Sequence, residues 1–232
     1  MHERLADPGA SAIEPRVTRR EVVILPHALP GSLRIPADAK SIVLFAHGSG
    51  SSRLSPRNVA VAEELNAHGI ATLLFDLLTT SEDMDRGNRF DIVLLAKRLG
   101  DAIQWKEHDP SVAALPLGLF GASTGAAAAL VAAANHPESV RAVVSRGGRP
   151  DLAGNALSKV RAPTLLIVGG EDYEVIELNK AALRRLSCDT SLEIVPGATH
   201  LFEEAGTLEE VMRLAAAWFE RRLSPEGQRH AR

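Results

Sequence analysis

The stretch Gly121-Ala122-Ser123-Thr124-Gly125 decides how this chain is interpreted, because it places a serine between a predicted strand and a predicted helix. The apolar run 117–120 precedes it and the alanine-rich run 126–134 follows it. A sharp strand-to-helix turn strains the serine backbone, and glycines on both sides remove the clashes that would forbid it. The pattern predicts an exposed nucleophile, Ser123, beside the positive end of a helix. The alternative is a glycine-rich turn whose serine only caps a helix.

Composition narrows the class of protein. The chain has 232 residues with 26 Lys and Arg against 29 Asp and Glu, a net charge of −3. This length suits one α/β domain, and the balanced charge gives no reason to expect a nucleic-acid partner. Cys188 is the single cysteine, so no internal disulfide forms, and the amino terminus lacks an apolar signal segment. We expect a cytoplasmic protein that does not bind a membrane.

Apolar runs alternate with helical patterns along the chain. An antiparallel pair is expected at 21–25 and 31–35, and continuously apolar runs suit a parallel sheet covered on both faces. The alternation predicts a doubly wound, mostly parallel α/β sheet with helices on both faces. We expect loose tails at 1–16 and 224–232 around a single domain at 17–223. The remaining strands are expected at 41–46, 70–75, 117–120, 142–145, 164–168 and 192–195.

Helix signals occupy the gaps between these strands. Ser55 is expected to cap a helix that has Pro56 at its first position and ends before Gly69. Thr207 and Glu210 form a capping-box pattern ahead of the last helix. Two apolar stripes, at 92–103 and 208–219, are expected to belong to the core rather than to a ligand site. Trp218 lies in the second stripe.

Three side chains suited to nucleophilic catalysis each follow a predicted strand. Ser123, Asp172 and His200 occur in the order known for nucleophile-elbow hydrolases, which differs from the serine-protease orders. Functional groups gather at the carboxyl ends of strands in an open parallel sheet, so these side chains are expected to converge. Glu171 is the rival for the acidic role, and a solvated loop position is the alternative for His200.

Each residue type has a chemical task in this arrangement. A serine hydroxyl is a poor nucleophile at neutral pH, so a neutral His200 would take its proton and later return it to the leaving group. Asp172 would hold the imidazole in the right tautomer and stabilise the cation. The prediction is a Ser123-His200-Asp172 triad.

The loop 46–52 after the third strand is predicted to complete the site. Backbone amides of Ser49 and Thr124 would form the oxyanion hole, and His47 is expected to brace the loop rather than act as a second base. The run 48–53 also resembles a dinucleotide fingerprint, but Arg53 stands where the third glycine belongs. Nicotinamide binding is therefore the weaker interpretation of this loop.

These motifs resemble the α/β-hydrolase superfamily and, within it, the small dienelactone-hydrolase-like members. The resemblance covers about residues 21–223. It implies hydrolysis of esters or lactones by a Ser-Asp-His triad, without a metal or organic cofactor. Dienelactone hydrolases proper have a cysteine at the elbow, where this chain has Ser123. The resemblance is carried by Phe45-Ala46-His47-Gly48-Ser49-Gly50, Phe120-Gly121-Ala122-Ser123-Thr124-Gly125, Gly169-Gly170-Glu171-Asp172 and Pro196-Gly197-Ala198-Thr199-His200.

Several loop residues are candidates for substrate binding. Fewer than twenty residues separate the strands at 142–145 and 164–168, so no cap domain is expected and the pocket should be open. Guanidinium groups at the catalytic edge would grip a substrate carboxylate or phosphate, although a bridge from Arg149 to Asp151 competes with this role. No metal-ligand spacing is present. The candidates are Arg53, Leu78, Arg146, Arg149 and Tyr173.

The hypothesis is a serine carboxylic ester hydrolase that acts on a small ester or lactone through an acyl-enzyme. Two alternatives stay open: an acyltransferase that uses the same acyl-serine, and a ligand-binding or sensor protein with negligible turnover. The sequence fixes neither the natural substrate nor the enantiopreference. It is compatible with a homodimer but does not determine the oligomeric state.

Overall fold

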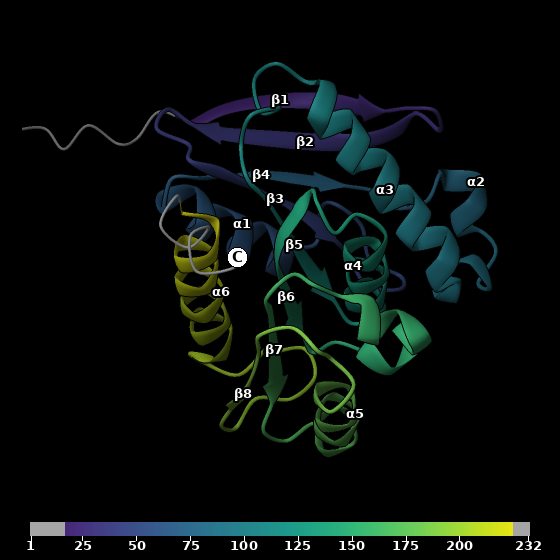
Figure 1. Ribbon diagram of the computed structural model, residues 1–232, viewed down its shortest axis with the longest axis vertical. Coiled ribbons are helices and arrows are strands. Elements are labelled where there is room, and N and C mark those ends of the chain that lie inside the picture. Colours follow the sequence, from purple (N-terminus) through teal and green to yellow (C-terminus); the bar gives the residue numbers. More distant parts are fainter. Residues whose placement is uncertain (1–16, 225–232) are drawn as a thin grey trace, which may run out of the picture.

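The computed structural model describes residues 17–224, which form one eight-stranded sheet in the order β1-β2-β4-β3-β5-β6-β7-β8 (Figure 1). β1 and β2 pair antiparallel, β2 pairs antiparallel with β4, and every other neighbouring pair is parallel. The predicted fold class is confirmed. The strands are β1 (Val17–Ile24), β2 (Leu29–Pro36), β3 (Ser41–Ala46), β4 (Ile70–Phe75), β5 (Leu117–Ala122), β6 (Val140–Arg146), β7 (Thr164–Gly169) and β8 (Thr190–Val195).

Helices cover both faces of this sheet. In Figure 1, α1 and α6 lie on one side, and α3, α4 and α5 lie on the other. The α-helices are α1 (Pro56–Ala67), α2 (Thr80–Asp83), α3 (Ile92–His108), α4 (Thr124–Asn135), α5 (Tyr173–Leu183) and α6 (Thr207–Leu223). Two 3₁₀ segments, η1 (Asn88–Phe90) and η2 (Pro150–Lys159), complete the set.

The core has two parts, one on each face of the sheet. Side chains of α3 and α4 pack on one face, and those of α1 and α6 pack on the other. Leu99 of α3 is fully buried, and Trp218 of α6 is 4% exposed, so both predicted stripes belong to the core. Gly118 allows α6 to approach, because a Cβ built there would lie 2.7 Å from Phe219 Cε1.

Two predicted helix caps differ from the structure. Ser55 occupies the position before α1, but its side chain makes no capping hydrogen bond. Thr207 is already the first residue of α6, and Gly206, with φ of 81°, precedes it. The Thr207 hydroxyl donates instead to the Glu204 carbonyl at 2.7 Å. The predicted capping box is therefore wrong, because the chain enters the helix through a left-handed glycine one residue earlier.

The connections leave the carboxyl edge of the sheet open. η2 fills the segment between β6 and β7, and residues 17–224 include no separate cap domain, in agreement with the prediction. The segment between β4 and α3 instead contains α2 and η1, two short helices that were not predicted from the sequence. The predicted tails lie outside the described residues, apart from Ser224.

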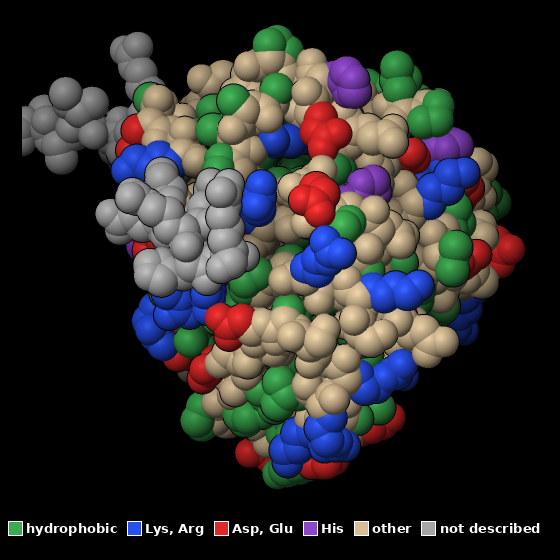
Figure 2. All heavy atoms as spheres, in the orientation of Figure 1, with side chains coloured by type: hydrophobic (Ala, Val, Ile, Leu, Met, Phe, Trp, Pro, Cys, Tyr) green, Lys and Arg blue, Asp and Glu red, His purple; other side chains and the backbone are tan. Residues whose placement is uncertain are grey.

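The surface carries charge of both signs. On the face seen in Figure 2, Lys and Arg side chains are interspersed with Asp and Glu side chains. Within residues 17–224, none of the helices combines the length and the apolar character that a membrane span requires.

Candidate active site

Ser123 occupies a strained turn between β5 and α4. Its backbone has φ of 52° and ψ of −120°, a conformation that costs a non-glycine residue about 1–3 kcal/mol. A Cβ on Gly121 would lie 2.4 Å from Ala126 Cα, and one on Gly125 would lie 2.2 Å from the Ala46 carbonyl oxygen. Glycine is therefore required on both sides, and the turn presents Ser123 at the carboxyl edge of the sheet.

The turn after β6 lies between this serine and the histidine loop. The Ser123 amide donates to the Arg146 carbonyl at 3.2 Å, and the Arg149 amide donates to the Ser123 carbonyl at 3.1 Å. A Cβ on Gly147 would lie 3.1 Å from the His200 carbonyl oxygen. Among residues 17–224 no hydrogen bond joins the Ser123 hydroxyl to the His200 ring. That link of the triad stays a prediction.

Asp172 and His200 form a hydrogen-bonded pair. The Nδ1 atom of His200 lies 2.7 Å from Asp172 Oδ2, and the two side chains are 39% and 15% exposed. The Glu171 amide donates to the Ala198 carbonyl at 2.9 Å, which fastens the two loops together. Glu171, the rival acid, accepts a hydrogen bond from the Tyr173 hydroxyl at 2.5 Å. The carboxylate that meets the imidazole is that of Asp172.

His47 has both ring nitrogens engaged in holding loops. The Leu77 amide donates to its Nε2 at 3.1 Å, and its Nδ1 lies 3.0 Å from the Gly48 carbonyl oxygen. An Nε2 that accepts from an amide carries no proton, so Nδ1 is the donor. Burial lowers the pKa of His47, which keeps the ring neutral. The side chain braces the loop after β3 against the segment after β4.

The predicted oxyanion loop approaches the nucleophile closely. A Cβ on Gly48 would lie 3.1 Å from Ser123 Cβ. The Ser49 amide, however, donates to Thr124 Oγ1 at 2.9 Å. From the sequence, this amide is expected to be available to the oxyanion. The structure instead engages it with the side chain of the residue after the nucleophile, which corrects that expectation.

Two of the arginines expected at the substrate are paired with carboxylates. Arg53 donates to Asp76 from its amide at 2.7 Å and from Nη1 at 2.5 Å. Arg149 binds Asp151 through two bonds of 2.9 and 2.8 Å, and this pairing raises the pKa of Arg149. These pairs hold loops in place, so substrate binding by Arg53 and Arg149 is not supported.

Arg146 is buried beneath the histidine loop instead of facing an open pocket. The residue is 8% exposed, its Nη2 lies 3.4 Å from Asn58 Oδ1, and its guanidinium lies 5.9 Å from the centre of the Phe202 ring. Desolvation, with a smaller contribution from Arg57, lowers the pKa of Arg146 to about 10. Residues 142 and 144 pack on the α1 and α6 face, and strand alternation sends Arg146 the same way. The predicted substrate contact is therefore corrected.

The apolar and aromatic candidates lie at the edges of the site. Leu78 is 7% exposed and lines a cavity of about 160 Å³ together with His47 and the 79–80 segment. Tyr173 is 69% exposed at the start of α5, directly after Asp172. Contact with a substrate stays a prediction for both residues.

The segment after β4 contributes residues that the sequence analysis missed. Arg86, Arg89 and Phe90 line an open cavity of about 290 Å³ together with Ser49 and Gly50 of the oxyanion loop. Asp83 binds the Arg89 side chain at 2.9 and 3.1 Å. Arg86 has no hydrogen bond or ion pair with any residue in 17–224. It is the exposed cation beside the oxyanion loop.

A sequence signal for this segment was present. Thr79 and Glu82 form a capping box, with the Glu82 amide donating to Thr79 Oγ1 at 3.2 Å and the Thr79 amide donating to Glu82 at 2.9 Å. Arg98 of α3 also donates to Glu82. The capping box predicts a helix directly after a strand end, and a helix there would carry Arg86 and Arg89 to the catalytic edge.

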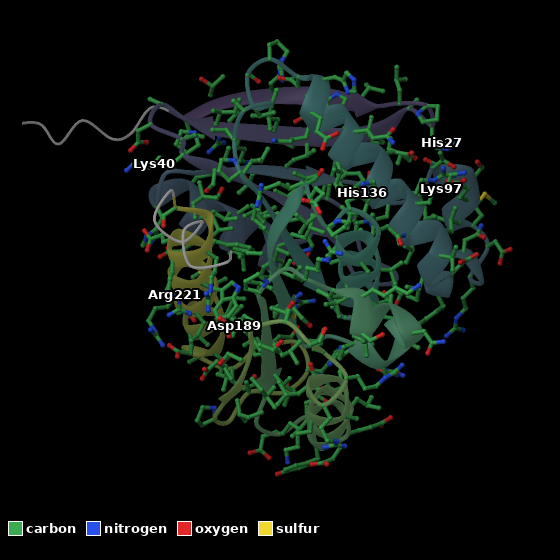
Figure 3. All side chains as sticks on the ribbon, in the orientation of Figure 1. His27, Lys40, Lys97, His136, Asp189 and Arg221 are labelled. Carbon is green, nitrogen blue, oxygen red and sulfur yellow. The ribbon has the colours of Figure 1, made fainter. Side chains whose placement is uncertain are left out.

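Cys188 lies away from Ser123, the predicted nucleophile. It lies next to Asp189, which directly precedes β8. Figure 3 labels Asp189 and also Lys40, which directly precedes β3. Both positions mark the amino ends of strands, whereas Ser123 follows the carboxyl end of β5.

Within the described range no group of three or more His, Cys, Asp or Glu side chains is placed to hold a metal ion. A cavity of about 210 Å³ lined by Lys40, His68 and Phe219, among others, is also at the amino ends.

Comparison with protein families and solved structures identifies relatives of this chain. Residues 39–217 match a family model described as an alpha/beta hydrolase domain. A crystal structure of dienelactone hydrolase from Anabaena variabilis is 55% identical, covers 91% of this chain and all of its own, and superposes with a TM-score of 0.87. Est1E from Butyrivibrio proteoclasticus shares the fold with a TM-score of 0.73 at 16% identity, over 88% of this chain and 98% of its own.

Two curated relatives come from Mycobacterium tuberculosis strains. Both are named "Putative phosphoribosyl transferase" and are 56% identical over 222 residues, or 94% of this chain. The chain spans about half the length of these relatives, since the match covers 50% of each.

Proposed function

Because the chain belongs to the alpha/beta hydrolase domain family, we propose that it hydrolyses small carboxylic esters or lactones through an acyl-serine intermediate. Ser123 is the proposed nucleophile, His200 the proposed general base and acid, and Asp172 the residue that orients the imidazole. The dienelactone hydrolase of Anabaena variabilis, at 55% identity, supports a substrate with an ester or lactone bond.

In the proposed first step, Ser123 Oγ attacks the carbonyl carbon while its proton moves to His200 Nε2. The carbonyl π electrons move to the oxygen, which becomes the oxyanion of a tetrahedral intermediate. The 2.7 Å bond from Nδ1 to Asp172 leaves Nε2 as the nitrogen that takes this proton. The intermediate collapses when the alcohol leaves with the proton from His200, and an ester to Ser123 is left behind.

In the proposed second step, water takes the place of the alcohol and hydrolyses the ester to Ser123. His200 takes a proton from water, the hydroxide attacks the acyl carbon, and the Ser123 alkoxide leaves with the proton that His200 returns. The carboxylic acid is released and the free enzyme is restored. The His200 side chain is 39% exposed, so water reaches the ring without a lid movement.

One observation carries the proposal: a serine with φ of 52° at the sheet edge shares that edge with a histidine already bonded to a carboxylate. Strained backbone at a non-glycine residue persists only where the surroundings impose it, and such strain clusters at active sites. A serine that merely capped α4 would accept a hydrogen bond from the first turn with its side-chain hydroxyl, and the Ser123 side chain makes no such bond.

The test uses a short-chain nitrophenyl ester and a fluorophosphonate probe. The expected result is turnover, together with covalent labelling that disappears in Ser123→Ala. A matched control is Ser139→Ala, a serine on the chain segment before β6 whose hydroxyl bonds Glu107. Absence of turnover and of labelling in the folded wild-type protein would refute the proposal.

An acidic group on the substrate would meet Arg86. This side chain is exposed beside Ser49 and Gly50, whereas the arginines expected from sequence are paired or buried. Phe90, 50% exposed in the same cavity, offers an apolar face next to the cation. We therefore propose that the protein prefers carboxyl-bearing esters and that Arg86 binds their acidic group. A comparison of kcat/KM between carboxyl-bearing esters and neutral esters tests this proposal.

Two other outcomes use the same site. An acyltransferase would deliver the acyl group from Ser123 to an alcohol or amine, and product analysis with a competing nucleophile separates it from a hydrolase. A sensor would show stabilisation by a ligand without turnover. We also propose a cytoplasmic location, which is supported by the sequence alone.

The name of the M. tuberculosis relatives suggests a different chemistry. Phosphoribosyl transfer displaces diphosphate from a sugar carbon and needs no acyl-serine. The elbow and the Asp172–His200 pair support acyl chemistry for this chain, which spans half of those relatives. We propose that phosphoribosyl transfer is not its reaction. Release of diphosphate from a phosphoribosyl diphosphate donor by this chain would overturn that statement.

A further inference from the structure

The bond between the Ser49 amide and the Thr124 side chain joins the two segments expected to bind the oxyanion. Ser49 N lies 2.9 Å from Thr124 Oγ1. Thr124 is 3% exposed and is the first residue of α4, directly after Ser123. The Thr124 hydroxyl therefore occupies the acceptor position that the oxyanion itself was expected to fill.

Two hydrogen-bond donors of Thr124, its hydroxyl and its backbone amide, have no acceptor among the described residues. A threonine hydroxyl has one proton and two lone pairs, and the Ser49 amide takes one of those lone pairs. Within residues 17–224, no group accepts a hydrogen bond from this hydroxyl. The Thr124 backbone amide, at the first position of a helix, has no intrahelical acceptor either. Both donors belong to the residue next to the nucleophile.

We propose that the Thr124 hydroxyl is a catalytic donor to the oxyanion, so that Thr124 donates twice, from its amide and from its side chain. Ser49 then acts through Thr124 as a positioning residue, since its amide fixes Oγ1 and leaves the hydroxyl proton to turn toward the developing charge. An amide that donates to a hydroxyl oxygen also strengthens that hydroxyl as a donor. This inference rests on the proposed acyl-serine reaction.

A rival arrangement makes the opposite prediction. Thr124 could be a placeholder that releases Ser49, whose amide would then bind the oxyanion directly. In that case removing the hydroxyl frees the amide, and catalysis is retained or improved. If the hydroxyl is the donor, its removal eliminates one donor from the oxyanion site.

The experiment compares Thr124→Val, which keeps the shape without the hydroxyl, with Thr124→Ser, which keeps the hydroxyl. With a short-chain nitrophenyl ester, Thr124→Val should lower kcat by about 10²-fold or more, the loss expected for one oxyanion donor, with KM changed less than about threefold. Thr124→Ser should stay within a fewfold of wild type. Thermal unfolding checks that both variants are folded.

A tetrahedral analogue gives a second readout. Phenylboronic acid adds to the serine hydroxyl and places an oxygen where the oxyanion forms. Its affinity should fall in Thr124→Val by a factor similar to that for kcat, since analogue binding follows transition-state stabilisation. A purely structural role for Thr124 would instead lower the unfolding temperature without this parallel loss.

The outcomes separate the inference from the proposed function. Turnover in wild type with unchanged or higher kcat in Thr124→Val would overturn the inference and leave the hydrolase standing. An equal loss in Thr124→Ser and Thr124→Val would also overturn it, because the hydroxyl would then not be the cause. A wild-type protein that neither turns over the ester nor reacts with fluorophosphonate would overturn the proposed function and the inference with it.

Discussion

Replacing Gly125 by alanine should damage both the stability and the activity of this protein. Gly125 is the second residue of α4, where alanine would ordinarily favour a helix by about 1 kcal/mol. Its backbone, however, lies against the end of β3. A Cβ there would be 2.2 Å from the Ala46 carbonyl oxygen and 2.5 Å from the His47 carbonyl oxygen. Both contacts are with backbone, which cannot rotate away.

The size of the effect follows from these distances. Ordinary van der Waals contact begins at 3.4 Å, so β3 and α4 would have to separate by about 1 Å. Overpacking costs about 1–3 kcal/mol, and two backbone contacts this short put Gly125→Ala at the upper end, about 3 kcal/mol. After the gain of about 1 kcal/mol in helix propensity is subtracted, the net loss of about 2 kcal/mol lowers Tm by about 4–8 °C in a domain of this size. A displacement of 1 Å between Ser123 and the oxyanion loop should lower kcat by about 10²-fold.

The assay measures Tm, the urea midpoint and nitrophenyl ester turnover for Gly125→Ala and for a matched control, Gly100→Ala. Gly100 is also helical, in α3, but a Cβ there meets only the end of the His136 ring, at 3.0 Å. The control should be unchanged or slightly stabilised, with normal turnover. Wild-type stability and turnover in Gly125→Ala would refute the packing argument.

Three further predictions concern the site. Asp172→Asn should lower kcat by about 10⁴-fold while the unfolding temperature changes little, because an amide favours the wrong His200 tautomer; a loss below tenfold would contradict the assigned role. Burial lowers the pKa of His47 below its ordinary 6.5, so the unfolded state binds the extra proton and stability should fall as pH drops below 6.5. His47→Gln should flatten that dependence in urea titrations, and an unchanged slope would contradict it. Arg86→Gln should lower kcat/KM about tenfold for acidic esters and leave neutral esters unchanged; equal losses on both would remove the assignment.

The strands could be predicted because the sheet is covered on both faces. Runs at 41–46 and 70–75 are apolar except for Ser41 and Thr72, and the strands have those same bounds. The residue at which a helix begins depends on the backbone angles of the residue before it, and amino-acid composition does not predict those angles. Gly206 enters the left-handed region ahead of α6, and Thr207 therefore lies inside the helix rather than at its cap.

The partners of the loop arginines show where sequence reasoning ends. Asp151 lies two residues from Arg149, so their pair was foreseen as an alternative. Asp76 lies on another strand end, and only the folded sheet brings it to Arg53. The face on which Arg146 lies follows from strand alternation, because residues 142, 144 and 146 share one face, which α1 and α6 cover. A period-two count along β6 would have removed it from the substrate candidates.

Gly147, a residue without a side chain, lies beside the path of the loop that carries the proposed base, His200. Neighbouring strands lie about 4.8 Å apart, so the ends of β5 and β8, three strands apart, are separated by about 14 Å. The His200 loop must therefore return across β7 and β6. Gly147, with φ of 50°, lies in its path, and a Cβ there would lie 3.1 Å from the His200 carbonyl oxygen and 3.6 Å from its Nδ1. The order Ser, Asp, His in the sequence predicts which strand ends take part. The room for the His200 loop depends on the absence of a side chain at Gly147, and the spacing of Ser123, Asp172 and His200 in the sequence does not reveal this.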